Sequence, residues 1–118
     1  MTLDPQALVT FALQVAEDKK AYDITVLNVG KISIVADYFI ICSGRSSIHV
    51  QSIAEGIVDV LEEKYSLRPR KEGVKEGHWI LLDYGDVVIH VFQDEDRQFY
   101  NLERLWGDAP VVDVAAGN

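Results

Sequence analysis

Two aspartates, Asp83 and Asp86, have the type and spacing that acid–base or metal chemistry requires. They lie three positions apart in the segment DYGD, between the apolar runs HWILL and VVIHVF. A general acid–base pair needs one buried carboxyl group with a shifted pKa, whereas the tip of a hairpin is normally in contact with water. Aspartate bonds its own backbone in tight turns, and glycine supplies a positive φ there. The sequence therefore predicts a structural turn that adds to an acidic surface.

The segment SGRSS at 43–47 is a second candidate, because it precedes a predicted helix and helix N-termini hold anions. It is similar to the glycine-serine turn of nucleotidyltransferases. A P-loop would need G-x-x-x-x-G-K-[ST], which is absent, and a nucleotidyltransferase would add a D-x-D pair on the next strand. Asp94 and Asp96 have that spacing but open the last predicted helix, where the helix dipole favours acids. Capping by Ser46 or Ser47 is favoured, with phosphate binding as the alternative.

The histidines and the single cysteine give no support to a metal site. His49, His78 and His90 are scattered singly, without the H-x-x-x-H spacing of zinc ligands. His90 lies within a predicted strand, which favours a hydrogen-bonded histidine of the sheet over a catalytic one. Cys42 lies in an apolar run and is expected to be a small buried hydrophobe in a reducing cytosol. We expect no metal and no cofactor.

The elements that must position these residues follow the order α-β-β-α-(β)-β-β-α. Helices are predicted at about 5–19, 48–65 and 95–106, and strands at 22–29, 37–43, 78–84 and 87–92, with a short edge strand within 68–77. This order predicts an α/β sandwich of two or three layers, with a mixed sheet of four or five strands flanked by helices. The chain has 118 residues and no repeat or linker, so we expect one domain over 1–118.

The charge of the chain argues against one class of function and favours another. The net charge is −8, and residues 83–108 alone carry −5. Direct binding of nucleic acid usually needs the opposite sign, so a basic protein partner that meets an acidic face is favoured. No stretch approaches the roughly 20 apolar residues that span a bilayer, and the N-terminal residues lack the basic region of a targeting peptide. We expect a cytoplasmic protein with no membrane contact.

One face of the predicted strand 78–84 needs a cover of its own. Trp79 and Leu81 point to one side of the sheet, while Ile80 and Leu82 point to the other and can fill the core under the helices. The first pair needs a helix or another protein over it. A tryptophan beside acids on a sheet face is typical of an interface anchor, so an interface is favoured over a core position.

Several segments resemble the Iojap-like family of ribosomal silencing factors. They are ADYFIICSG-S, the EG before the hairpin, WILLDYGDVVIHVF and R-x-FYNLERLW, in order from about Ile24 to Asp108. The resemblance implies a fold related to nucleotidyltransferases but without their catalytic equipment. It also implies binding to the fourteenth protein of the large ribosomal subunit. That protein lies on the face that meets the small subunit, so a factor bound there would keep the two subunits apart. Translation would thereby be repressed under nutrient limitation.

The residues and the resemblance together predict a translation repressor that is not an enzyme. Arg97 and Tyr100, one helical turn apart, are expected to form an exposed patch. The partner-binding residues are expected to be Trp79, Leu81, Asp83, Asp86, His90, Arg97 and Tyr100. A homodimer is expected when the ribosome is absent, because self-association would cover the Trp79/Leu81 face. The alternative is a small nucleotide-binding or nucleotidyl-transferring enzyme that uses SGRSS with Asp37 or Asp83 and magnesium.

Overall fold

The computed structural model describes residues 4–30 and 36–100, with the backbone alone at 98–100. Three helices are present: α1 (Pro5–Asp18), α2 (Ser47–Tyr65) and α3 (Asp94–Tyr100). The five strands are β1 (Tyr22–Asn28), β2 (Tyr38–Gly44), β3 (Arg70–Glu72), β4 (Trp79–Asp83) and β5 (Val87–Gln93). The predicted order is confirmed, with element ends that differ by one or two residues. The part of the predicted last helix beyond residue 100 lies outside the described residues.

The five strands form one mixed sheet with the spatial order β1-β2-β5-β4-β3. The central strand β5 runs parallel to its neighbour β2, with Tyr38 opposite Val87 and Gly44 opposite Gln93. All the other neighbouring strands are antiparallel, and β4 and β5 form a hairpin. The prediction of a mixed sheet of four or five strands is therefore confirmed.

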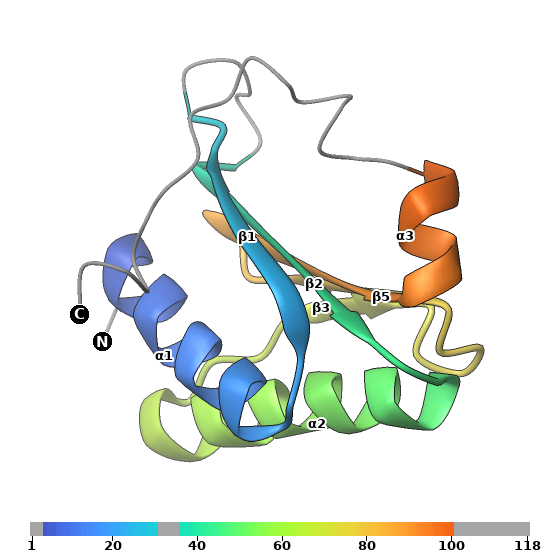
Figure 1. The fold of residues 1–118 in the computed structure, drawn as a ribbon. Helices are drawn as coiled ribbons and strands as arrows, with labels where there is room; N and C mark the ends of the chain where they lie inside the picture. The colour runs from blue at the N-terminus through green and yellow to red at the C-terminus, as the bar shows by residue number, and fades with distance from the viewer. Residues whose placement is uncertain (1–3, 31–35, 101–118) are drawn as a thin grey trace.

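The helices cover the two faces of this sheet unequally. Helices α1 and α2 pack side by side under one face, whereas α3 stands on the opposite face, near the ends of β2 and β5 (Figure 1). The main core lies between the sheet and α1 and α2, and the helices contribute apolar residues at helical spacing. Its strand residues include Ile40, Cys42, Ile80, Leu82, Ile89 and Val91, and its α2 residues are Val50, Ile53, Ala54, Ile57 and Leu61. None of the described helices combines the length and apolar character that crossing a membrane requires.

A second, smaller apolar cluster lies on the α3 side of the sheet. Its buried members are Leu27, Val29, Ala36, Ile41, Val88 and Phe92, and its half-buried members are Phe39, Trp79 and Leu81. The alternation along β4 assigns each side chain to its face, because successive strand residues point in opposite directions. Ile80 and Leu82 are fully buried under the helices, while Trp79 and Leu81 lie on the other side. This confirms the predicted division of the strand.

Candidate functional site

The segment DYGD is a tight turn that connects β4 to β5. The Asp83 carboxylate accepts a hydrogen bond from the Gly85 N–H at 2.8 Å, and Gly85 has a φ of +90°. The carbonyl oxygen of Asp86 accepts the backbone N–H groups of Asp37 at 2.8 Å and Tyr38 at 3.1 Å. The turn is thus fixed to the first residues of β2. The predicted aspartate–glycine turn chemistry is confirmed.

The segment SGRSS leads into α2, and the side chain of Ser46 caps this helix. Ser46 Oγ accepts the His49 N–H at 3.1 Å, and the Arg45 N–H donates to His49 Nδ1 at 3.0 Å. Since Nδ1 is an acceptor, the ring proton lies on Nε2, which donates to the Lys19 carbonyl at 2.8 Å. Two backbone donors that a bound phosphate would use at this helix end are therefore already occupied. The capping interpretation is confirmed, and Ser46 is the cap.

The residues of the alternative enzyme site lie at opposite ends of the sheet. Asp37 precedes β2, and Asp83 pairs with Val88 near the start of β5. Because β2 and β5 are parallel, both aspartates lie at the end where these two strands begin, whereas Gly44 of SGRSS closes β2. A strand of seven residues spans about 20 Å, too far for a shared magnesium ion. Within residues 4–30 and 36–100, no group of three His, Cys, Asp or Glu side chains could hold a metal ion.

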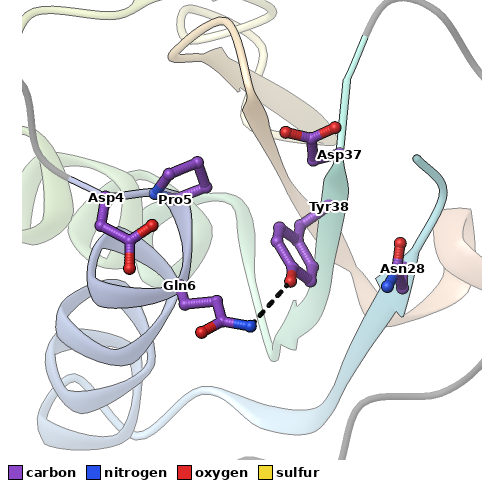
Figure 2. A pocket seen from close by; sticks show the side chains of 6 residues that line it. All are labelled: Asp4, Pro5, Gln6, Asn28, Asp37 and Tyr38. Atoms are coloured by element: carbon purple, nitrogen blue, oxygen red, sulfur yellow. Dashed lines mark hydrogen bonds between the residues drawn. The ribbon is translucent and has the colours of Figure 1, made fainter.

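A cavity of about 330 Å³ opens where α1 and β2 begin and β1 ends. Figure 2 shows its lining residues, which are Asp4, Pro5, Gln6, Asn28, Asp37 and Tyr38. Gln6 Nε2 donates to the Tyr38 hydroxyl at 3.3 Å across it. The two carboxylates would favour a positively charged group, but none of the predicted partner-binding residues lines this cavity.

Four rings on the α3 side of the sheet form what we call the aromatic cluster: Phe39, Trp79, His90 and Phe92. Trp79 stacks on Phe92, its neighbour across β4 and β5, with ring centroids 4.9 Å apart. Phe39 of β2 meets His90 edge-on at 4.9 Å. The indole N–H of Trp79 donates to His90 Nδ1 at 3.1 Å. Two of the predicted partner-binding residues, Trp79 and His90, are therefore bonded to each other.

His90 is only 4% exposed, which decides how it can act. An indole N–H can only donate, so His90 Nδ1 is unprotonated and the ring proton lies on Nε2. Burial disfavours the charged imidazolium and lowers the pKa of His90 to about 4. Nε2 has no hydrogen-bond partner within the described part of the chain. The prediction of a hydrogen-bonded sheet histidine holds for one nitrogen, whereas direct contact between His90 and a partner does not fit this burial.

The position of Trp79 depends on the turn that leads into β4. Gly73 follows β3 with a φ of +75°, a conformation that side chains with a Cβ rarely adopt. A Cβ built at Gly73 would lie 2.1 Å from the carbonyl oxygen of Trp79. The chain therefore needs glycine here to bring β3 back along β4.

Arg97 does not form the exposed patch that the sequence predicted. Its guanidinium is half-buried and donates to Ser43 Oγ at 2.8 Å, to Thr25 Oγ1 at 3.4 Å and to the carbonyl oxygen of Asp23. These acceptors belong to β1 and β2, so the residue ties α3 to the sheet. Sequence reasoning missed Ser43 and Thr25 because the contact joins residues more than 50 positions apart. The side chain of Tyr100 lies outside the described residues.

The acidic segment does not form one continuous face over its described part, 83–100. Asp83 and Asp86 lie at the β4–β5 turn, and Asp94, Glu95 and Asp96 lie in the first turn of α3. The seven residues of β5 separate the two groups. Asp96 is also paired with His78, with an Nδ1–Oδ2 distance of 3.1 Å. Over the described residues, the acidic segment therefore places negative charge at both ends of the aromatic cluster.

Cys42 is fully buried in the main core, as the sequence predicted. Burial raises the pKa of its thiol to about 12, because the thiolate would lose its hydration there. The thiol is thus neutral at physiological pH and behaves as a small apolar side chain.

Comparisons with known proteins give consistent results over nearly the whole chain. The model of a family described as "Ribosomal silencing factor during starvation" matches residues 2–118. The ribosomal silencing factor RsfS of Bacillus subtilis is 44% identical over 98% of this chain and 98% of its own length. The chloroplastic protein Iojap of Arabidopsis thaliana is 40% identical over 86% of this chain, which corresponds to 42% of that longer relative.

Two solved structures have the same fold. A crystal structure from Chromobacterium violaceum matches with a TM-score of 0.86 at 32% identity and covers 89% of this chain and 88% of its own. One from Bacillus halodurans has a TM-score of 0.82 at 41% identity and covers 92% of this chain and 99% of its own. The resemblance to the silencing factors is thereby confirmed.

Proposed function

This chain belongs to the family of ribosomal silencing factors that act during starvation, and we propose that it binds the large ribosomal subunit and blocks its joining to the small subunit. The contact that we propose is with the fourteenth protein of the large subunit, in the cytoplasm, when nutrients are scarce. The block is steric, because a protein on the joining face occupies space that the small subunit needs. Translation then falls without any covalent chemistry.

The observation that carries this proposal is the face of the sheet opposite α1 and α2. Trp79 and Leu81 are half-buried there, next to the rings of Phe92 and His90. Half-buried aromatic residues on a rigid strand are well suited to anchor a partner, because little conformational entropy is lost when they bind. The sheet holds the backbone of Leu81 from both sides, between Glu72 of β3 and His90 of β5, and it holds that of Trp79 through its pairing with Phe92 of β5.

The charge around this face supports a basic partner. Asp83 and Asp86 lie at one end and Asp94 and Glu95 lie at the other, in a chain with a net charge of −8. Complementary charge speeds the encounter with a basic protein, while the aromatic contact slows dissociation. The proposed contact therefore combines an apolar centre with acidic ends.

The absence of an enzymatic role is part of the proposal and has its own support. The end of α2 that would have to hold a phosphate is capped by Ser46 and His49. The aspartates that would have to hold magnesium lie at the other end of the sheet. Magnesium and a nucleoside triphosphate should therefore leave the melting temperature unchanged. A clear rise would favour the enzyme alternative.

The test is a pair of assays with purified bacterial ribosomal subunits. The wild-type protein should co-sediment with large subunits and reduce the yield of joined ribosomes when small subunits are added. Trp79→Ala should lose both effects. The matched control is Ile48→Ala, since Ile48 is 76% exposed and belongs to α2, on the other side of the sheet. Joining that is unaffected by excess wild-type protein would refute the proposal.

We also propose that the free protein forms a homodimer through the Trp79/Leu81 face. Isologous pairing would cover the face with a second copy of itself. Sedimentation should then show a dimer at high micromolar concentration, and Trp79→Ala should shift it to monomer. A wild-type protein that remains monomeric at this concentration would rule the dimer out.

A further inference from the structure

We propose that His90 is a positioning residue, whose Nδ1 holds the indole of Trp79 in the orientation that the ribosomal partner binds. This inference rests on the proposed function, because the partner gives the orientation its importance. It assigns His90 a role other than direct contact. The bond in question runs from Trp79 Nε1 to His90 Nδ1 and measures 3.1 Å.

Among the described residues, Phe92 and His90 limit the indole of Trp79 in different ways. Stacking on Phe92, with an interplanar angle of 26° and centroids 4.9 Å apart, sets the plane of the indole ring. A half-turn about the Cβ–Cγ bond would leave the indole in nearly the same plane but point its N–H the other way, so stacking alone does not choose between the two orientations. The hydrogen bond to His90 removes this freedom, because it requires the indole N–H to point at one atom.

His90 is itself held firmly enough to act as a fixed acceptor. Its ring lies on a central strand, is 4% exposed and is met edge-on by Phe39 at 4.9 Å. Trp79 and His90 lie on the same face of adjacent strands and are diagonal neighbours, since Leu81 is the residue directly opposite His90. A buried, packed ring loses no further freedom when it accepts a bond, so the constraint falls on Trp79.

The first test reads the bond directly and does not require a partner. Trp106→Phe leaves Trp79 as the only indole, and its N–H can be followed by NMR for chemical shift and hydrogen exchange. His90→Leu removes the acceptor and should speed exchange at least tenfold. His90→Asn provides a carbonyl oxygen in place of Nδ1 and should restore most of the protection. The matched control His78→Leu changes the exposed histidine next to Trp79 and should leave the exchange unaltered.

The second test uses purified large ribosomal subunits and asks whether His90 acts through the indole N–H. In the wild-type background, His90→Leu should weaken binding about tenfold, and His90→Asn less than threefold. In a Trp79→Phe background, which has no N–H, the same His90→Leu change should alter binding less than twofold. This loss of effect would not occur if His90 served only the packing of the sheet. Thermal melts of each variant show whether the protein is folded under the binding conditions.

The outcomes separate the inference from the proposed function. Equal effects of His90→Leu in both backgrounds would overturn the positioning role, as would exchange that does not change. If Trp79→Ala binds large subunits as tightly as the wild type, Trp79 is not the anchor, and the inference falls with the interface. If Trp79→Ala loses binding while His90→Leu retains it, only the positioning role is overturned.

Discussion

Acidification should destabilise this protein through one buried histidine. His90 has a pKa of about 4 in the folded chain, because burial disfavours its charged form, and about 6.5 when unfolded. Between these values the unfolded chain binds a proton that the folded chain does not, so stability falls as the pH falls. The full contribution is present above pH 6.5 and is lost as the pH decreases toward 4.

The size of the effect follows from the two pKa values. At pH 5 the unfolded state is almost fully protonated at His90 and the folded state almost fully neutral, which corresponds to a loss of about 2 kcal/mol relative to pH 7. The assay is urea unfolding of the wild type and of His90→Asn at both pH values. Carboxylates titrate in both proteins, so the difference between their losses isolates His90. Losses that agree within about 0.5 kcal/mol would show that His90 does not titrate as its burial requires.

The remaining predictions concern Trp79, the β3–β4 turn and salt. Trp79→Ala should weaken the free energy of binding to the large subunit by roughly 2 kcal/mol or more. It should lower the free energy of unfolding by about 2 kcal/mol, less than the loss of a fully buried aromatic residue would. A protein that is already unfolded in the thermal melt would instead assign Trp79 to the core. In urea unfolding, Gly73→Ala should lower the free energy of unfolding more than Gly85→Ala. Both glycines have a positive φ, but of the two only Gly73 would place its new Cβ against a carbonyl oxygen. Equal losses of unfolding free energy in the two variants would contradict this prediction. Raising salt should slow association with the large subunit more than it speeds dissociation, and a salt-independent on-rate in stopped-flow measurements would remove electrostatic steering.

The sequence predicts the elements of this fold well, because their signals are local. The stripe along α2 and the alternation of Ile80 and Leu82 with Trp79 and Leu81 depend only on helix and strand periodicity. The DYGD turn and the Ser46 cap are likewise set by residues two or three positions apart. Such features can be inferred from neighbours in the chain.

The errors concern contacts between residues that are distant in the chain. The reach of Arg97 to Ser43 and the bond between Trp79 and His90 depend on which strands become neighbours, and the sheet order is not encoded in any short segment. The sequence shows that residues 83–108 are acidic, but not that β5 separates their described acids into two groups at opposite ends of a strand. The candidate anchor could thus be predicted, whereas the residue that orients it could not.

The central parallel pair delays completion of the sheet until the chain is nearly made. Strand β2 ends at Gly44, whereas its inner neighbour β5 begins at Val87. Until that strand has been synthesised, the inner edge of β2 carries unpaired backbone groups that can associate with other chains. The β4–β5 hairpin is local and closes within microseconds. We therefore expect β3, β4 and β5 to form first as a unit, which then pairs with the β1–β2 pair through β5. A nascent chain that ends before Val87 cannot complete this pairing.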